Sequence, residues 1–177
     1  MTNGQKEIQF SPETLQRAEA IIARYPEGKH KSALIPLLHL AQDEFSGWLS
    51  PEVMNYVASI LKIQNIEVYE VASFYSMFNL HKRGNCLIEV CHTSSCWLMG
   101  AEDVVRHIGK RLGIGVGETT PDGLFTLKTV ECLGACGYAP MFQVGDKFYE
   151  HLTLEKVDAL IEEFNGEFAG KVSVYLD

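Results

Sequence analysis

Two stretches decide how this chain is interpreted: Cys91-His-Thr-Ser-Ser-Cys96 and Cys132-Leu-Gly-Ala-Cys136. Residues 97–131 separate them, which is enough chain for a helix and a strand to fold back and bring the two cysteine pairs together. Four convergent thiolates are the usual ligand set of an iron–sulfur cluster. The first pair is spaced more widely than the pairs common in structural zinc sites, which suits a loop around a larger inorganic body. The pattern therefore favours a [2Fe–2S] centre that carries electrons.

Other uses of these thiols stay open at this point. Tetrahedral thiolate coordination suits zinc as well as iron, so a zinc site is a real alternative. Disulfides would need an oxidising compartment, and the Cys-x-x-Cys spacing of redox dithiols does not occur. His92 lies inside the first cysteine loop, but a histidine ligand normally accompanies fewer cysteines. The fifth thiol, Cys86, lies in an apolar run and is expected to be a small buried hydrophobe.

Composition excludes several classes of protein. The net charge of −8 argues against a nucleic-acid binder and against binding to an anionic membrane surface. No apolar stretch approaches the roughly 20 residues of a membrane span, so we expect no direct span. The first ten residues show neither an apolar signal core nor a transit-peptide pattern. We therefore expect a bacterial cytoplasmic protein whose thiols are reduced or metal-bound.

Residues 1–80 are expected to form an N-terminal helical bundle. Ser11-Pro12-Glu13 and Ser50-Pro51-Glu52 are helix-start signals, with serine as the N-cap and proline at the first helical position. Apolar residues at helical spacing predict further helices over Ser32–Phe45 and near Val68–Phe78. Several of these helices are apolar around more than half their circumference, which indicates an additional buried or partner-facing side.

Residues 81–177 are expected to form a thioredoxin-like α/β domain, which makes the whole chain α+β. The predicted order is β-α-β-β-β-α: strand Cys86–Val90, helix Trp97–Leu112, strand Phe125–Val130, a hairpin of Met141–Val144 and Lys147–Glu150, and a helix from Thr153. The glycines between Leu112 and Glu118 follow a helix and do not have the G-x-G-x-x-G spacing, so they predict a helix exit and no dinucleotide site.

The residues around the cysteines suggest how a cluster would be stabilised. Cys96 is expected at the N-terminus of the Trp97–Leu112 helix, where free amides point toward sulfur. Gly134 and Gly137 would let backbone N–H groups approach closely. A set of large side chains either shields the site from water or simply packs the core: Trp97, Leu98, Met99, Tyr138 and Met141.

At these residues the sequence resembles a known family. Asp122-Gly-Leu-Phe125-Thr126, followed after five residues by Cys132-Leu-Gly-Ala-Cys136-Gly-Tyr-Ala139-Pro140, is similar to the signature of the 24 kDa subunit of respiratory complex I. Gly47-Trp-Leu-Ser50 and Val71-Ala-Ser-Phe-Tyr-Ser-Met-Phe78 resemble the same family, so the similarity extends over nearly the whole chain.

The resemblance implies a [2Fe–2S] cluster bound by Cys91, Cys96, Cys132 and Cys136. It implies one-electron exchange with the FMN of an adjacent NADH-binding subunit, within an NADH:quinone oxidoreductase on the cytoplasmic side of the bacterial inner membrane. FMN and NAD would belong to that partner, further complex I subunits would be present, and no residue of this chain would act as a catalytic acid, base or nucleophile. The alternatives are the small diaphorase subunit of an NAD-linked hydrogenase or formate dehydrogenase, and a zinc-stabilised interaction subunit without a redox role.

Overall fold

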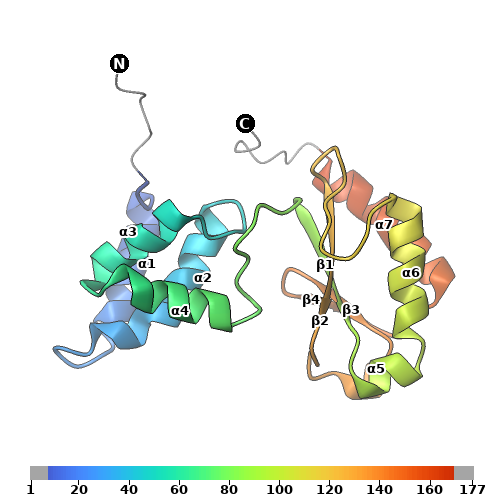
Figure 1. Cartoon of the computed structure of the whole chain (residues 1–177), viewed down its shortest axis with the longest axis horizontal. Helices are drawn as coiled ribbons and strands as arrows, with labels where there is room; N and C mark the ends of the chain where they lie inside the picture. Colours follow the sequence, from blue (N-terminus) through green and yellow to red (C-terminus); the bar gives the residue numbers. More distant parts are fainter. Residues whose placement is uncertain (1–7, 170–177) are drawn as a thin grey trace. The chain divides into compact units, whose positions relative to one another are not determined.

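The computed structural model describes residues 8–169 and divides the chain into two compact units, with the boundary between Lys82 and Arg83. Figure 1 shows a helical unit followed along the chain by a unit built around a sheet. Residues 1–7, which carry much of the N-terminal pattern used to exclude an export signal, lie outside the described residues. Within residues 8–169, no helix combines the length and the apolar character that a membrane crossing requires.

The first unit is formed by α-helices packed around one core. Its elements are α1 (Pro12–Ile22), the 3₁₀ turn η1 (His30–Ala33), α2 (Leu34–Glu44), α3 (Pro51–Leu61) and α4 (Asn65–Phe74). Leu37, Leu38 and Val57 are fully buried where these helices meet. The predicted caps are present: Ser11 Oγ accepts from the Thr14 amide and Ser50 Oγ from the Val53 amide. Each serine satisfies an amide that the first helical turn leaves unpaired.

Two predicted boundaries in this unit were wrong. The segment predicted as a helix from Ser32 begins instead as η1, and α2 starts at Leu34. The fourth helix begins at Asn65, because Gln64 and Glu67 form a capping box there, and it ends at Phe74 instead of Phe78. Aromatic residues at helical spacing continue past that end, which explains why the pattern overestimated the helix.

The second unit is a four-stranded mixed sheet with the strand order β2-β1-β3-β4. Its strands are β1 (Cys86–Cys91), β2 (Phe125–Val130), β3 (Phe142–Val144) and β4 (Lys147–Tyr149). β1 is parallel to β2 and antiparallel to β3, and β3 is antiparallel to β4 across the predicted turn. This confirms the predicted strand order along the chain and the thioredoxin-like α+β class.

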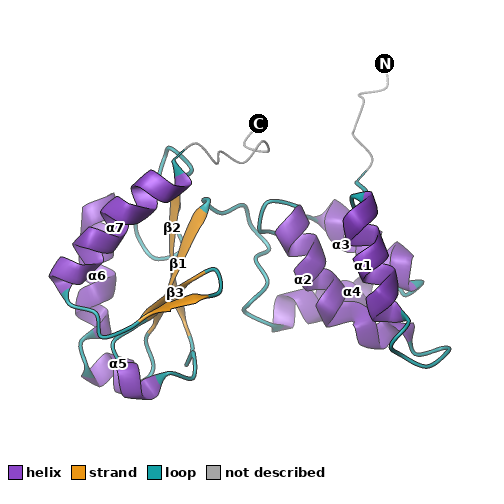
Figure 2. Ribbon diagram, turned by 180° about the vertical axis from the view of Figure 1, so that it is seen from behind, coloured by secondary structure: helices purple, strands orange, loops and turns teal. Residues whose placement is uncertain are grey.

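Helices α6 (Ala101–Leu112) and α7 (Leu154–Phe168) cover one face of this sheet, as Figure 2 shows. Ile88 of β1 and Phe142 of β3 are fully buried against Ile108 of α6 and Phe164 of α7. Side chains alternate along a strand, so the same face of β1 also buries Cys86 and Val90 in this core. The last residue of β1, Cys91, belongs to a different cluster together with Cys96 and Met141.

The predicted Trp97–Leu112 helix is two helices. A short helix, α5 (Ser94–Leu98), precedes α6, and Gly100 between them has a φ of 93°. This left-handed conformation is available to glycine at little energetic expense and changes the direction of the chain. Cys96 therefore lies within α5 and not at the N-terminus of a long helix, so the predicted dipole contribution from that helix was wrong.

Candidate metal centre

The sheet topology brings the four cysteines together. Cys91 ends β1, and its register partner in the neighbouring parallel strand is Val130, the last residue of β2. The loops after both strands therefore leave the same edge of the sheet. The first loop leads into α5 with Cys96, and the second carries Cys132 and then Cys136 at the start of the 3₁₀ turn η2 (Cys136–Tyr138).

The thiols form two close pairs. Cys132 Sγ and Cys136 Sγ are 3.4 Å apart, and the Gly134 amide donates to Cys132 Sγ over 3.4 Å. This confirms that the small residues of the second loop let a backbone N–H approach sulfur. In the other pair, the Cys96 thiol hydrogen-bonds to Cys91, whose Sγ also lies 3.5 Å from the Thr93 hydroxyl.

In each pair, one thiol ionises more readily than the other. Burial opposes ionisation of Cys91, but hydrogen bonds led by that from Thr93 hold its pKa below the ordinary value. Burial and then the neighbouring Cys91 sulfur raise the pKa of Cys96 to about 11. The Gly134 amide lowers the pKa of Cys132, and Cys132 in turn raises the pKa of Cys136. Each pair thus favours one thiolate that accepts a hydrogen bond from its neighbour, and metal binding would displace the second proton.

Every thiol also has a hydrogen-bond donor other than its partner cysteine. Cys91 accepts hydrogen bonds from the Leu133 backbone and the Thr93 side chain, and Cys96 accepts one from the Met141 amide. Cys136 accepts a hydrogen bond from the Ser95 hydroxyl. Donors aimed at sulfur stabilise negative charge there, which is the condition for holding an anionic cluster and for tuning its reduction potential. The cysteine spacing alone did not reveal the roles of Thr93 and Ser95, although both lie in the first cysteine loop.

Burial divides the site into an inner and an outer half. Cys91 and Cys96 are each only 2% exposed, whereas Cys132 and Cys136 are exposed. The site therefore has one pair of thiols buried inside the domain and one pair at its surface.

The paired arrangement fits a two-iron cluster better than a single ion. A zinc site would gather its four ligands around one ion. Here the thiols lie instead as two close pairs, Cys91 with Cys96 and Cys132 with Cys136. A [2Fe–2S] cluster with four cysteines takes two thiolates on each iron. The donor set and its grouping therefore suit that cluster.

The remaining residues singled out in the sequence have other roles. Cys86 is fully buried in the core between sheet and helices, away from the other thiols. His92 Nε2 lies 3.8 Å from the Glu131 carboxylate. Met141 is buried beside the site, but four other residues predicted to shield it or fill the core are largely exposed: Trp97, Leu98, Met99 and Tyr138. The peptide bond between Ala139 and Pro140 is cis.

A thioredoxin-like sheet with two cysteine pairs on adjacent loops defines a class, the thioredoxin-like iron–sulfur proteins. The family model described as thioredoxin-like [2Fe–2S] ferredoxin matches residues 18–165, and the chain belongs to this family.

Similar proteins agree with this assignment. A subunit of the NADH-quinone oxidoreductase of Rickettsia felis is 47% identical over 159 residues, which cover 90% of this chain and 95% of that protein. NADH dehydrogenase [ubiquinone] flavoprotein 2, mitochondrial, of Dictyostelium discoideum is 46% identical over 163 residues, which cover 92% of this chain and 66% of that protein. In a solved NAD⁺-reducing [NiFe]-hydrogenase, a similar fold matches 76% of this chain with a TM-score of 0.67. At 20% identity, and with only 23% of that chain covered, this match shows the fold alone.

Proposed function

We propose that this chain is the electron-transfer subunit of an NADH-quinone oxidoreductase. It exchanges single electrons between a [2Fe–2S] cluster, bound by Cys91, Cys96, Cys132 and Cys136, and the FMN of an adjacent NADH-oxidising subunit. The observation that carries the proposal is the pair of two-thiol groups at one sheet edge, each thiol with a further hydrogen-bond donor. Relatives at 44–47% identity that are named as NADH-quinone oxidoreductase subunits support the respiratory assignment.

The chain's own residues hold and tune the site. A bound [2Fe–2S] cluster supplies one-electron chemistry. Cys91 and Cys96 would hold it from the buried side of the site, and Cys132 and Cys136 would hold it from the exposed side. The donors at Thr93, Leu133, Ser95, Gly134 and Met141 stabilise charge on the sulfurs without moving. The proposed role requires no side chain of this subunit to act as an acid, base or nucleophile.

The partner in this proposal is a flavin-bearing, NADH-binding subunit that carries both FMN and NAD. We place the complex, with its other subunits, at the cytoplasmic side of a bacterial inner membrane. In this proposal the helical unit forms part of the interface with that partner. Phe74 is 79% exposed and Tyr75 40% exposed, and their rings pack edge to face at 5.0 Å. Exposed aromatic side chains of this kind are common interface anchors. Phe78, at 5% exposure, fills the helical core instead.

Anaerobic reduction followed by EPR tests the proposal. We expect about two iron atoms per chain and a single-electron [2Fe–2S] signal, with a potential near the roughly −400 mV of plant-type ferredoxins because all ligands are cysteines. A colourless protein that holds zinc would support the non-redox interaction subunit instead. A [4Fe–4S] signal would contradict the proposed cluster.

The second candidate is the small diaphorase subunit of an NAD-linked hydrogenase or formate dehydrogenase. The fold similarity to the NAD⁺-reducing hydrogenase favours it, but only at the level of fold. Purification of the native complex decides between the two: a membrane-associated assembly that reduces quinone with NADH supports the respiratory role, and one that oxidises hydrogen or formate supports the alternative.

A further inference from the structure

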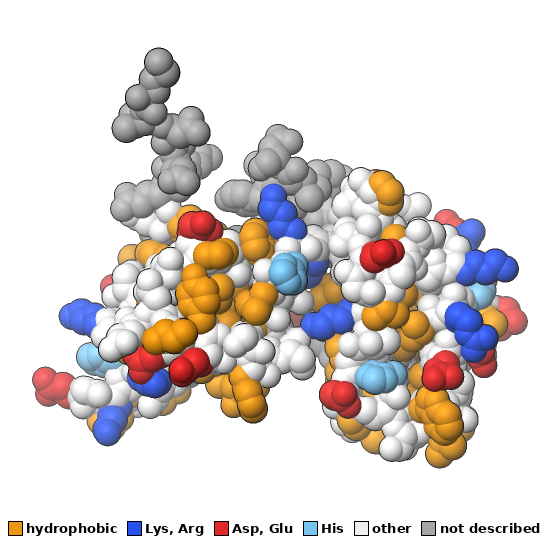
Figure 3. Space-filling view, viewed as in Figure 1, with side chains coloured by type: hydrophobic (Ala, Val, Ile, Leu, Met, Phe, Trp, Pro, Cys, Tyr) orange, Lys and Arg blue, Asp and Glu red, His pale blue; other side chains and the backbone are white. Residues whose placement is uncertain are grey.

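The exposed thiols of Cys132 and Cys136 are placed to react with each other. We call them the outer pair, and Cys91 and Cys96 the inner pair. The two outer Sγ atoms lie 3.4 Å apart, and both thiols are free and exposed. In Figure 3, the end of the second unit where Figure 1 draws α5 lies at the molecular surface. Because α5 contacts η2, the turn that begins at Cys136, the outer pair belongs to this accessible end.

The loop between the outer thiols has room to move. Gly134, in the middle of the loop, has a φ of 83°, and this left-handed conformation turns the chain so that the two cysteines approach each other. A Cβ at Gly134 or at Gly137 would meet no atom within 4 Å among the described residues, so the loop is not packed tightly there. A disulfide bond of about 2.05 Å would need the two sulfurs only about 1.3 Å closer than they are.

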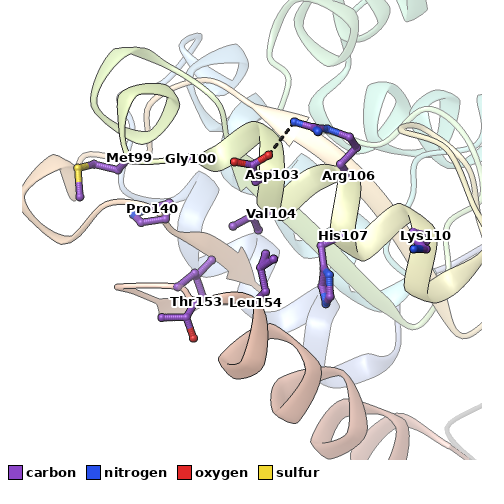
Figure 4. Close-up of a pocket in the computed structure, with 11 residues that line it drawn as sticks. Met99, Gly100, Asp103, Val104, Arg106, His107, Lys110, Pro140, Thr153 and Leu154 are labelled. Atoms are coloured by element: carbon purple, nitrogen blue, oxygen red, sulfur yellow. Dashed lines mark hydrogen bonds and ion pairs between the residues drawn. The ribbon is translucent and has the colours of Figure 1, made fainter.

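The inner pair is held and shielded in a different way. Cys91 and Cys96 are each only 2% exposed. Cys91 ends β1, where its amide donates to the Met141 carbonyl, and Cys96 lies within α5. A groove of about 480 Å³ runs between α6 and the start of α7, with Met99 and Pro140 at one end (Figure 4), but neither inner thiol lines it. An oxidant in solution therefore reaches the outer pair far more easily than the inner pair.

We propose that Cys132 and Cys136 form a disulfide in the cluster-free chain, and that this bond reversibly blocks uptake of the cluster. The inference rests on the proposed function, in which the same two thiols are ligands. Iron binds the thiolate form of cysteine, so a disulfide removes two of the four ligands at once. A bound cluster occupies both outer sulfurs and protects them, which confines the oxidation to the empty chain.

A peroxide is the oxidant that the step requires. One outer sulfur attacks a peroxide oxygen, the O–O bond breaks, and a sulfenic acid and one water form when the peroxide is hydrogen peroxide. The second outer sulfur then attacks the first, the S–O bond breaks, and a second water leaves as the S–S bond forms. The two thiols lose two electrons and two protons, which hydrogen peroxide accepts. A dithiol reverses the reaction by exchange and itself becomes the disulfide, so in a reducing compartment the bond is transient.

Mass spectrometry of the full-length, cluster-free chain tests where the bond forms. Trypsin cleaves after lysine and arginine and therefore separates the pairs: residues 84–106 contain the inner pair, and residues 129–147 contain the outer pair. After treatment with hydrogen peroxide, we expect the 129–147 peptide to lose the mass of two hydrogen atoms at least about tenfold faster than the 84–106 peptide. Cys132→Ser should abolish this loss, whereas Cys91→Ser should retain it because the outer pair reacts without the inner one.

Cluster transfer tests what the bond does. A loaded [2Fe–2S] scaffold protein is mixed with the oxidised or the reduced chain in buffer without thiols, and visible absorption and EPR of the re-isolated chain report the uptake. We expect the oxidised chain to take up less than about a tenth of the cluster that the reduced chain takes up. Treatment with dithiothreitol, followed by its removal, should restore uptake. Cys86→Ala is the matched control, because it removes a thiol outside the site and should leave both the oxidation and the block unchanged.

Several outcomes would overturn the proposal. Equal oxidation rates of the two peptides, or a disulfide that joins the 84–106 peptide to the 129–147 peptide, would show that the outer pair does not react selectively with itself. Disulfide-linked dimers as the main product would assign the exposed thiols to contacts between chains. An oxidised chain that takes up the cluster as well as the reduced chain would remove the block. A reduced wild-type chain that takes up no cluster contradicts the proposed function instead, so the two failures are distinguishable.

Discussion

The four candidate ligands differ in their surroundings, but at each position the cluster requires a soft sulfur ligand. Cys91 and Cys96 are buried, and Cys132 and Cys136 are exposed, so solvent reaches only one pair. Replacing any of them by serine substitutes a harder, more basic oxygen for a thiolate. We expect each variant to lose the cluster or shift its visible spectrum, with iron content falling to less than about half. Iron analysis and absorption spectra of the four purified variants check this.

If Cys91, Cys96, Cys132 and Cys136 are the ligands, the fifth cysteine, Cys86, should be dispensable for the cluster. If Cys86→Ala bleached the protein while one of the four named thiols proved dispensable, the ligand set would be wrong. We expect instead that Cys86→Ala keeps colour and iron and loses only packing free energy, because Cys86 lies in the core behind β1.

Cys86 should also make stability depend on pH. Burial raises its pKa from 9.0 to about 12. Between these values the unfolded chain releases this proton and the folded chain keeps it, so the free energy of unfolding falls as pH rises. The loss attributable to Cys86 is at most about 1.4 kcal/mol per pH unit. Denaturant unfolding of wild type and Cys86→Ala from pH 8 to 10.5 measures the difference, and parallel pH profiles would contradict the prediction.

At the scale of elements, the glycines of two helices have opposite roles. A Cβ at Gly109 in α6 would lie 2.9 Å from the Ile114 carbonyl oxygen, which is backbone and cannot easily move. A Cβ at Gly166 in α7 would have no neighbour within 4 Å. The close approach at Gly109 lets the chain turn back directly after α6, where the Ile114 amide donates to the Gly109 carbonyl.

The same glycine-to-alanine substitution should therefore change the free energy of unfolding in opposite directions at the two positions. Gly166→Ala should stabilise the protein by about 0.5–1 kcal/mol, the ordinary gain of alanine over glycine in a helix. Gly109→Ala should destabilise it by about 1–3 kcal/mol, because the added methyl overpacks the helix exit. Thermal or denaturant unfolding of both variants measures the changes, and a stabilising Gly109→Ala would refute the close contact.

At the scale of the whole molecule, the two units have separate hydrophobic cores. The core of the first unit contains buried residues from Phe10 to Phe78, and those of the second unit contain residues from Cys86 to Phe164. The four candidate ligands and their hydrogen-bond donors all belong to the second unit.

We therefore predict that removal of residues 1–80 leaves a folded, coloured domain that binds the flavin-bearing partner more weakly or not at all. Circular dichroism and the visible spectrum report on the fold and the site, and co-purification reports on the partner. A colourless or unfolded fragment would show that the site depends on the helical unit. Undiminished co-purification would show that Phe74 and Tyr75 are not needed for binding the partner.

The sequence alone was enough to predict features that depend on neighbouring residues. The helix starts at Ser11 and Ser50, the order of strands and helices, and the turn between β3 and β4 follow from capping, periodicity and turn chemistry. The candidate ligands were visible in the spacing of the cysteines, and the buried position of Cys86 was visible in its apolar strand.

Only the tertiary structure decided features that depend on residues far apart in the chain. The break at Gly100 divides a continuous apolar pattern because α5 packs beside the second cysteine loop while α6 packs on the sheet. The exposure of Trp97, Leu98 and Tyr138 could not be predicted, because periodicity locates apolar residues but not the surface that covers them. The same holds for two backbone donors. The Leu133 backbone reaches Cys91 because parallel pairing of β1 and β2 brings both cysteine loops to one edge of the sheet, and the Met141 amide reaches Cys96 because β3 pairs with β1.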